Sequence, residues 1–170
     1  QHSLEVALTG ARLNHWRVDL DTQETFPGPL DEEFFGFVAN SVDELVEVIH
    51  PEDLPTFRQF GNYEKIIRNG THAAEYRVKR TQGDGWRWLS SFSRHVKQSS
   101  NEIGMIVGVT WDITQRKETE MALELANQKL LAGMSAAHML YFEWDMKTGK
   151  RNVIGAEHDL LGTHIAHIGT

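Results

Sequence analysis

The stretch that decides the fold runs from Gly104 to Lys117 and reads Gly-Met-Ile-Val-Gly-Val-Thr-Trp-Asp-Ile-Thr-Gln-Arg-Lys. Its first part, up to Trp111, is rich in β-branched and aromatic residues, which is typical of a buried strand. From Asp112 the chain becomes polar and helix-forming, and neither proline nor glycine interrupts it before Leu131. Since Asp112 or Thr114 can accept the free N–H groups of a first helical turn, the sequence predicts a strand that passes directly into a helix. We expect this stiff junction to move the helix when the sheet changes.

The composition excludes several classes of function. The 170 residues carry 17 Lys and Arg against 24 Asp and Glu and contain no basic run, so no nucleic-acid partner is expected. The sequence has no cysteine, which excludes disulfides, thiolate metal sites and photochemistry through a cysteine adduct. No apolar stretch approaches the roughly 20 residues of a membrane span. We therefore expect a soluble, cytoplasmic segment without a membrane partner.

The first part of the chain is predicted to form short helices and short strands. Residues 4–13 have the apolar spacing of a helix, and residues 15–20 alternate as in a strand with one apolar face. A turn leads to a second short strand that ends at Phe26. Asp31 and Ser41 each precede an apolar stretch and are predicted helix caps.

A long helix and three long strands complete the predicted domain. His50-Pro51-Glu52-Asp53 places a proline and two acids at a helix start, and this helix is predicted to run from Glu52 to Asn69. The following strands are predicted at residues 74–81, 86–97 and 105–111. This order predicts an α+β domain with a five-stranded antiparallel sheet, helices on one face only, and a C-terminal linker helix.

The sequence starts again after the linker helix. A shift of 126 positions places Asp19 on Asp145, and it places Glu33-Phe34-Phe35-Gly36 on Asp159-Leu160-Leu161-Gly162 without a gap. Residues 132–170 are therefore predicted to be the opening of a second copy of the domain, too short to bury a core alone.

Three segments follow from this repeat: a domain over residues 1–117, a linker helix over 118–131, and a domain fragment over 132–170. The strands between Tyr141 and Val153 lack the rest of their sheet. We expect them to be disordered or to pair with an exposed sheet edge, rather than to form a free-standing hairpin.

Four motifs occur in the order and at the separations of a known family. They are His50-Pro51-Glu52-Asp53, Glu75-Tyr76-Arg77-Val78, Gly85-Trp86-Arg87-Trp88-Leu89 and Gly108-Val109-Thr110-Trp111-Asp112-Ile113-Thr114. With the order of elements, residues 4–117 resemble a PAS domain of the third PAS-fold family with its C-terminal PAC motif. Residues 132–164 resemble the start of a tandem second PAS domain. The resemblance implies a sensory or partner-binding module of a bacterial multidomain signalling protein, commonly a histidine kinase or an enzyme of cyclic di-nucleotide turnover, and neither output domain is found in this sequence.

The expected ligand site is a pocket between the sheet and the helical layer. Its candidate lining residues are Phe37, Leu45, Phe57, Phe60, Tyr76, Trp88 and Phe92. Aromatic side chains at such positions more often fill a core, which a domain of this size needs. A polar ligand would also need buried donors, and the sequence leaves open which strand residues supply them from among Ser90, Ser91, Ser93 and Arg94.

Metals, haem and flavin are not expected, and no catalytic residue is predicted. The nine histidines lack the i, i+4 spacing of a helical metal site. The resemblance implies that a haem would use a histidine inside or just ahead of the long helix. His50 alone stands there, and it is better explained as a capping or packing residue. A flavin adduct needs the absent cysteine, and no feature favours a non-covalent flavin.

Signal transmission is predicted at Trp111, Asp112, Ile113 and Thr114, although a helix cap alone would explain the same residues. A stripe with heptad-like steps follows on the helix, at Ile113, Glu120, Leu123, Asn127, Leu130 and Met134. It fits a parallel coiled-coil homodimer, or a helix that packs on its own sheet.

Two functional hypotheses remain close. In the first, the domain binds a small ligand and passes the change through the strand-to-helix junction. In the second, it is a ligand-free scaffold that sets dimer geometry and relays signals. An enzyme is a distant third hypothesis, because no nucleophile elbow, phosphate loop or metal-ligand spacing occurs.

Overall fold

The computed structural model describes residues 8, 10–97, 99, 103–139 and 141–154. Half of the stretch 4–13, predicted to be a helix, lies outside these residues, and its described end is wrong, because residues 11 and 12 form a turn and Leu13 begins a strand. The chain divides into two compact units, Gln1–Lys117 and Glu118–Thr170. The first unit contains β1 (Leu13–Asp19), β2 (Thr25–Phe26), α2 (Asp31–Phe35), α3 (Val42–Leu45), η1 (Val46–Val48), η2 (Pro51–Asp53), α4 (Leu54–Phe57), η3 (Arg58–Gly61), α5 (Tyr63–Asn69), β3 (Thr71–Lys79), β4 (Trp86–Val96), β5 (Met105–Asp112) and the first turn of α6 (Thr114–Ala136).

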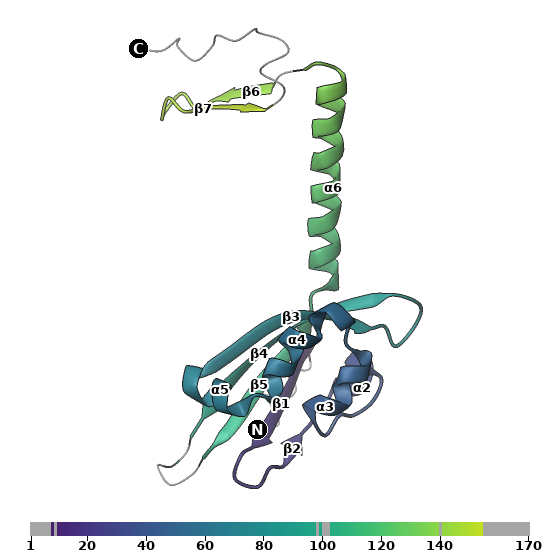
Figure 1. Cartoon of the computed structure of the whole chain (residues 1–170), viewed down its shortest axis with the longest axis vertical. Coiled ribbons are helices and arrows are strands. Elements are labelled where there is room, and N and C mark those ends of the chain that lie inside the picture. The colour runs from purple at the N-terminus through teal and green to yellow at the C-terminus, as the bar shows by residue number, and fades with distance from the viewer. Residues whose placement is uncertain (1–7, 9, 98, 100–102, 140, 155–170) are drawn as a thin grey trace. The chain divides into compact units, whose positions relative to one another are not determined.

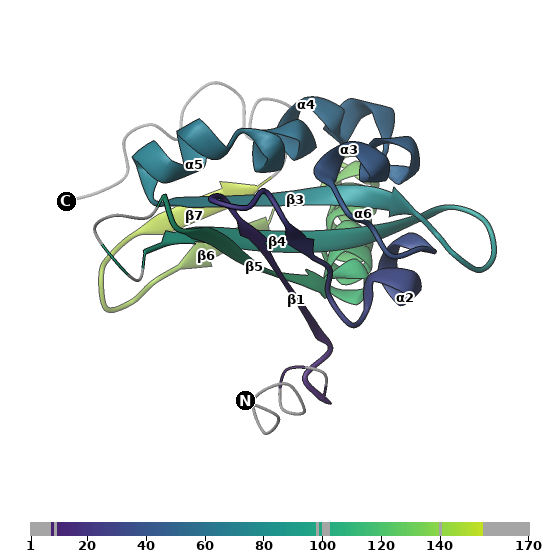
Figure 2. The same cartoon turned by 90° about the horizontal axis from the view of Figure 1, so that it is seen from below.

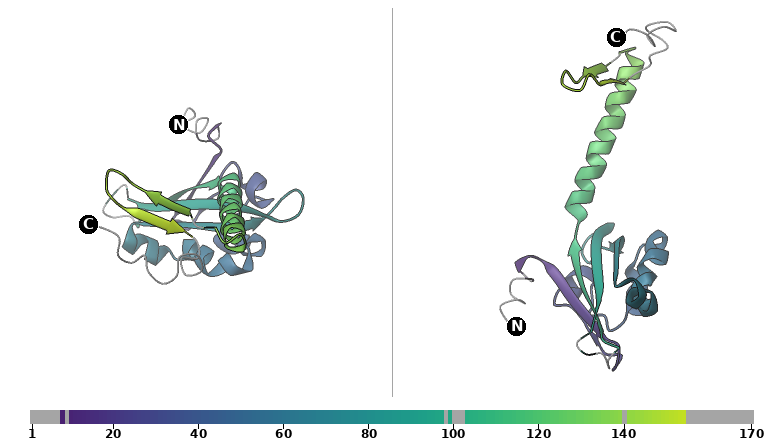
Figure 3. Two further views of the ribbon diagram at one scale, coloured as in Figure 1. Left: turned by 90° about the horizontal axis from the view of Figure 1, so that it is seen from above. Right: turned by 90° about the vertical axis from the view of Figure 1, so that its left-hand side faces the viewer.

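A five-stranded antiparallel sheet forms the first unit, in the order β2-β1-β5-β4-β3 (Figure 1). The helices from α2 to α5 cover one face of this sheet (Figures 2 and 3). The predicted α+β class, the five antiparallel strands and the one-sided helical layer are therefore confirmed. The register places Trp16 opposite Gly108, Ser91 opposite Thr110, and Leu89 opposite Tyr76.

The core lies between the sheet and the helices. Because successive strand residues point to opposite faces, alternate residues of β1, β3, β4 and β5 face the helices. Buried strand residues on this inner face are Val18, Tyr76, Val78, Leu89 and Ile106. Buried aromatic residues from the helical layer are Phe34, Phe35, Phe57 and Phe60.

The single long helix predicted from Glu52 to Asn69 is wrong. The structure has four short segments there, η2, α4, η3 and α5. The break comes at Asn62, whose backbone is not helical (φ −87°, ψ 75°) and whose Oδ1 accepts the N–H of Lys65 to start α5. Gly61, just before it, weakens the helix because glycine loses more backbone freedom than any other residue. The predicted end at Gly70, with φ 78°, is confirmed.

The second unit contains the remainder of α6 and a hairpin of β6 (Tyr141–Trp144) and β7 (Arg151–Ile154). The two strands are antiparallel and form a sheet of their own. The expectation that they would be disordered or would join another sheet of this chain is therefore wrong for the described residues, and pairing with the sheet edge of another chain stays a prediction. The turn between them supplies a local reason, because the Asp145 carboxylate accepts two backbone N–H groups.

The turns of the two hairpins are the same. Asp19 Oδ1 accepts the backbone N–H groups of the residues two and three positions later, both at 3.0 Å. Asp145 Oδ1 accepts the corresponding N–H groups at 2.8 and 3.2 Å. Arg17 faces Phe26 across the first hairpin, and the residues 126 positions later face each other across the second. The repeat in sequence is thus also a repeat of turn and register.

Candidate functional site

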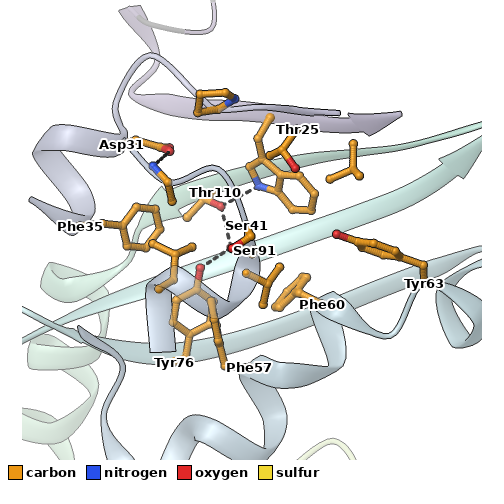
Figure 4. A pocket seen from close by; sticks show the side chains of 16 residues that line it. Thr25, Asp31, Phe35, Ser41, Phe57, Phe60, Tyr63, Tyr76, Ser91 and Thr110 are labelled. Atoms are coloured by element: carbon orange, nitrogen blue, oxygen red, sulfur yellow. Dashed lines mark hydrogen bonds between the residues drawn. The ribbon is translucent and has the colours of Figure 1, made fainter. Parts of the chain in front are cut away.

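A cavity of about 70 Å³ lies between the inner face of the sheet and the helical layer (Figure 4). Side chains of β1, β3, β4 and β5 form one wall. Side chains of the segment that runs from Thr25 in β2 to Tyr63 in α5 form the other. Its apolar lining consists of Trp16, Val18, Pro27, Phe35, Ala39, Val42, Leu45, Phe57 and Phe60. Its polar lining consists of Thr25, Asp31, Ser41, Tyr63, Tyr76, Ser91 and Thr110.

Four of the seven side chains predicted from the sequence line this cavity. They are Leu45, Phe57, Phe60 and Tyr76. The three rings pack against one another, and the centroids of Phe57 and Tyr76 lie 4.8 Å apart in an edge-to-face contact. The same rings therefore belong to the core and to the cavity wall.

The other three predicted side chains lie elsewhere. Leu89 and Ser91 point inward from β4, so Trp88 and Phe92, at the alternate positions, lie on the opposite face of the sheet. Phe92 lines a surface depression on that face. Phe37 follows α2 and packs against the core cluster without reaching the cavity.

A chain of hydroxyl groups crosses the sheet wall of the cavity. Tyr76 Oη lies 2.7 Å from Ser91 Oγ, and Ser91 Oγ lies 2.7 Å from Thr110 Oγ1. The indole N–H of Trp16 donates to Thr110 Oγ1 at 3.2 Å. Figure 4 shows Tyr76, Ser91 and Thr110 in line along the cavity. Four strands thus contribute to one polar network inside an otherwise apolar space.

The Tyr76 phenol at the end of this chain stays neutral. Burial raises its pKa to about 12, although the hydroxyl groups of Ser91 and Thr110 act in the opposite direction. The network therefore carries hydroxyl protons, and no phenolate forms at physiological pH.

Asp31 is a buried wall residue of the cavity, and its predicted role as a helix cap is wrong. Leu30 occupies the cap position of α2, and no side chain bonds there. Asp31 Oδ1 instead accepts from Asn14 Nδ2 at 2.6 Å, and Oδ2 accepts from the N–H of Ala39 at 3.3 Å. Burial raises the pKa of this carboxyl group, against the effect of its hydrogen bonds. Gly28 makes room for Asn14, since a β-carbon on Gly28 would overlap the amide.

The sequence interpretation missed Trp16, Asp31 and Thr110 as cavity residues. Strand alternation was the available signal for two of them. Thr110 shares its strand parity with the buried Ile106, and Trp16 shares its parity with the buried Val18. The partner of Asp31 is remote in sequence, and no local pattern points to it.

His50 has the capping and packing role that was predicted. Its Nδ1 accepts the N–H of Glu52 at 3.2 Å, and its ring meets the Trp86 ring edge-on at 4.5 Å between centroids. In the described part of the chain, no three acidic or histidine side chains come together in a way that could hold a metal ion. No helix among the described residues is long and apolar enough to cross a membrane.

The strand-to-helix junction is held by backbone and side-chain bonds to β4. The N–H of Ile113 donates to the carbonyl of Trp88 at 2.9 Å, and the N–H of Trp88 donates to Thr114 Oγ1 at 3.0 Å. The N–H of Thr114, the first residue of α6, donates to Asp112 Oδ1 at 2.8 Å, so of the two predicted acceptors, Asp112 and Thr114, Asp112 accepts a free N–H of the first helical turn. Trp111 is half-buried at the end of β5, opposite Ser90. The junction is therefore tied to the neighbouring strand at two consecutive residues.

Arg87 connects this junction to the helical layer. Its Nε lies 3.4 Å from Asp112 Oδ2, and its Nη1 donates to the carbonyl of Glu33 at 2.8 Å. The guanidinium also lies 5.7 Å from the centroid of the Phe34 ring. One side chain thus contacts both the end of α2 and the residue that caps α6.

A second set of contacts holds the first turn of α6 to β3. Glu75 pairs with Arg116 at 2.5 Å and with Lys117 at 2.7 Å. These bonds, that of Lys117 first, lower the pKa of the Glu75 carboxyl group. Lys117 Nζ and the Arg77 guanidinium also lie 5.1 and 5.2 Å from the Trp88 ring. The helix start is therefore fixed to the outer face of the sheet.

Removing the Thr114 hydroxyl is expected to loosen the junction. In Thr114→Val, the N–H of Trp88 loses its acceptor. We expect the free energy of unfolding to fall by about 1–2 kcal/mol, with faster amide exchange at Trp88. Chemical denaturation and amide exchange measure both effects. Thr114→Ser keeps the hydroxyl and is the matched control; an equal loss of stability in both variants would contradict the role given to this bond.

Arg77 joins two of the sequence motifs. Its Nε and Nη2 donate to the two oxygens of Asp53 at 2.8 and 2.9 Å, and Nη2 also reaches Glu52 at 2.7 Å. The backbone N–H of Arg77 donates to Asp53 as well. These bonds lower the pKa of the Asp53 carboxyl group. The pair ties the start of the helical layer to β3.

The Asp53–Arg77 pair predicts a dependence of stability on pH. Because its pKa is lower in the folded chain, Asp53 contributes stability that is present above about pH 4 and is lost as the pH falls through the folded pKa. We expect Arg77→Met to lower the free energy of unfolding by about 2 kcal/mol at about pH 6. The difference from the unchanged chain should shrink as the pH falls below about 4 and through the lowered pKa of Asp53 in the folded chain.

Urea unfolding at about pH 6 and below about pH 4 measures this effect. Lys79→Met changes an exposed cation two positions along the same strand and is the control. Asp31, whose pKa is shifted the other way, is common to all three chains and cancels in the comparison. A deficit in Arg77→Met that stays constant across the pH range would show that packing, and not the ion pair, carries the stability.

Comparison with protein families matches residues 31–110 to the PAS fold. Among solved structures, the chain is similar to a sensory box histidine kinase/response regulator from Burkholderia thailandensis, with 26% identity, a TM-score of 0.54 and coverage of 75% of this chain and 96% of that one. It is also similar to the N-terminal domain of a diguanylate cyclase with a PAS/PAC sensor from Marinobacter aquaeolei, with 22% identity, a TM-score of 0.51 and coverage of 62% and 98%. The second likeness is one of fold. The search of curated proteins found no match. Together with the five-stranded antiparallel sheet and its one-sided helical layer, the family match shows that residues 31–110 form a PAS fold domain.

Proposed function

We propose that this PAS domain is a sensory module that binds a small ligand in the cavity and transmits the change through residues 111–114 to α6. The observation that carries the proposal is that cavity wall and junction share two strands. Thr110 lines the cavity and lies two residues before Asp112 on β5. Ser91 also lines the cavity, and it follows Trp88 on β4 by three residues. Trp88 is the residue whose backbone bonds to the junction. A ligand that moves either hydroxyl group acts on a strand that ends at the helix start.

The helical wall offers a second connection. Asp31 and Phe35 of α2 line the cavity, and Glu33 and Phe34 between them contact Arg87. Because Arg87 also pairs with Asp112, a shift of α2 changes the position of the group that caps α6. The proposal assigns no catalysis to the chain.

Native mass spectrometry of the freshly purified chain, with an absorption spectrum of the same sample, tests the sensory proposal. We expect part of the folded chain to carry an additional mass. In Ala39→Val, which narrows the cavity, a smaller fraction of the chain should carry it. A clean protein mass, together with no response to any added small molecule, would contradict ligand sensing and favour a scaffold.

A second function, as a dimerisation scaffold, is favoured by the exposure of α6. None of its side chains is buried in the described part of the chain. Leu123 and Leu130 on the heptad-like stripe are 62% and 61% exposed, and Asn127 lies between them. An asparagine at a core position fixes the register of parallel coiled coils, at a cost in stability. These features support a parallel homodimer through α6.

The scaffold proposal predicts the effect of charge on the stripe. We expect the double substitution Leu123→Glu and Leu130→Glu to raise the dimer dissociation constant at least about 100-fold, since it buries like charges in the seam. Leu125→Glu is the matched control, because Leu125 is similarly exposed but lies off the stripe. Sedimentation velocity measures the change; a monomeric unchanged chain, or equal effects of both variants, would contradict this interface.

We also propose that residues 132–170 open a second PAS domain of the parent protein, with residues 118–131 as the linker. The shared turn and register of the two hairpins support this. Exchanging residues 22–24 for 148–150, which keeps the bonds from the Asp21 carboxylate to the N–H groups of Ile103 and Gly104, should therefore leave the first domain folded with little change in stability. Loss of folding on this exchange would count against the equivalence of the hairpins.

A further inference from the structure

We propose that the cavity selects a small, uncharged molecule that carries a hydrogen-bond acceptor, and that the hydroxyl chain of Tyr76, Ser91 and Thr110 donates to this acceptor. The inference rests on the proposed sensory function and names its ligand class. Three properties of the site lead to it: its size, the number of its hydroxyl protons and the lack of a cationic side chain among its described lining residues.

The size of the cavity limits the ligand. An apolar cavity of roughly 150 Å³ holds one benzene molecule, and the present cavity, at about 70 Å³, has about half that volume. A water needs only a small part of this space. The cavity in this conformation therefore fits a short-chain molecule of a few non-hydrogen atoms. A flavin or a haem would require α2 and α3 to move away from the sheet.

Within the hydrogen bonds of the described residues, the row of three hydroxyl groups leaves one hydroxyl proton unused. Three hydroxyl groups bring three protons, and the two oxygen–oxygen contacts of 2.7 Å use one proton each. The Trp16 indole N–H also donates to Thr110 Oγ1, and as a donor it accepts none of the three hydroxyl protons. Whether the hydroxyl groups donate from Tyr76 toward Thr110 or in the opposite direction, one O–H at an end of the row remains to donate. Because a buried donor without an acceptor is destabilising, the site favours a ligand that carries an acceptor.

The charges of the lining exclude ions as preferred ligands. No lysine, arginine or histidine among the described residues lines the cavity, so an anion would lose its hydration without a compensating cation. Asp31 is the one carboxyl group among the described lining residues. Its two oxygens already accept from Asn14 Nδ2 and from the N–H of Ala39. Burial disfavours the charged form of this carboxyl group, and a cation would also lose its hydration in a lining that is otherwise uncharged. The site therefore suits a neutral ketone, aldehyde, ester or alcohol.

Four small molecules that are similar to one another in size separate these properties. They are 2-butanone, its isostere 2-methyl-1-butene, butyrate and n-butylammonium. The isostere replaces the carbonyl oxygen with a CH₂ group and so removes only the acceptor. Titrations followed by amide and indole N–H shifts report binding at the site, and the Trp16 indole N–H, which bonds to Thr110, is the local reporter. Trp16→Phe assigns its signal.

We expect 2-butanone to shift the Trp16 indole and Thr110 amide signals, and the other three to bind at least about tenfold more weakly. Equal binding of 2-butanone and 2-methyl-1-butene would overturn the role of the hydroxyl proton. Tighter binding of butyrate or n-butylammonium would overturn the selection for a neutral ligand. A large or charged molecule that co-purifies with the chain would overturn this inference and still support the sensory function.

The substitution Ala39→Val tests whether 2-butanone binds in this cavity. Ala39 is buried and lines the cavity, so two added methyl groups take up its space. We expect the affinity for 2-butanone to fall at least about tenfold with cooperative unfolding retained. Val42→Leu, at a half-buried lining position, serves if the first variant does not fold. Ala73→Val, at an exposed position of β3, is the control; unchanged affinity in both cavity variants would overturn the site.

Discussion

Replacing Gly108 with alanine is expected to lower the free energy of unfolding by about 2–3 kcal/mol and to abolish the indole bond of Trp16. Trp16 of β1 lies directly opposite Gly108 of β5. A β-carbon added to Gly108 would come within 3.0 Å of three atoms of the indole ring. The ring must move, and it is both a wall of the cavity and the donor to Thr110. Chemical denaturation and the indole N–H signal measure the two effects.

Gly61→Ala is the matched control for this substitution. A β-carbon on Gly61 would meet Val42 at 3.7 Å, an ordinary contact. We expect its stability to change by less than about 0.5 kcal/mol. A stable Gly108→Ala chain with an unchanged indole signal would show that the strand can adjust, and that Gly108 is not needed to position Trp16.

Replacing Phe34 with alanine is expected to cost about 3–4 kcal/mol, the largest loss among these substitutions. Phe34 is fully buried in the core cluster and lies against the Arg87 guanidinium. The cavity left by the ring also frees Arg87 from one of its contacts. We therefore expect faster amide exchange at Ile113, beyond what the lower global stability explains.

Two control substitutions show whether the loss of stability comes from the buried volume of the Phe34 ring rather than from any change in this segment. Phe34→Leu keeps most of the apolar volume and should cost less than about 2 kcal/mol. Val38→Ala removes an apolar side chain that is 45% exposed and should change stability by less than about 0.5 kcal/mol. If Phe34→Ala lowers stability while exchange at Ile113 follows only the global change, α2 does not act on the junction through this ring.

The order of elements could be predicted from the sequence because the signals are local. Strand alternation, the turn after Asp19 and the change of period at Asp112 each involve neighbouring residues. The same local view failed at Glu52–Asn69, where the apolar spacing continues across Asn62 although the backbone turns there. Periodicity follows the buried face of the layer, and that face continues through the break because all four segments pack on one sheet.

The candidate site was harder to predict because its contacts join remote residues. Four lining positions, three aromatic residues and Leu45, followed from apolar side chains expected between the sheet and the helices, whereas Trp88 and Phe92 were misplaced for want of the strand register. The bond between Trp16 and Thr110 spans 94 positions, and that between Asn14 and Asp31 spans 17. Gly108 did carry a signal, since glycine within a strand often marks a close approach. Its partner could be identified only from the pairing of β1 with β5.

The central claim is that the state of the cavity changes the start of α6. Amide hydrogen exchange in Ala39→Val tests it most directly, because the added methyl groups occupy the cavity without any need to know the ligand. The account predicts that exchange at Ile113 and Lys117 changes by at least about threefold relative to the unchanged chain, while the β6–β7 hairpin keeps its exchange rates. Changes confined to residues that contact the cavity, with the junction unaltered, would contradict it.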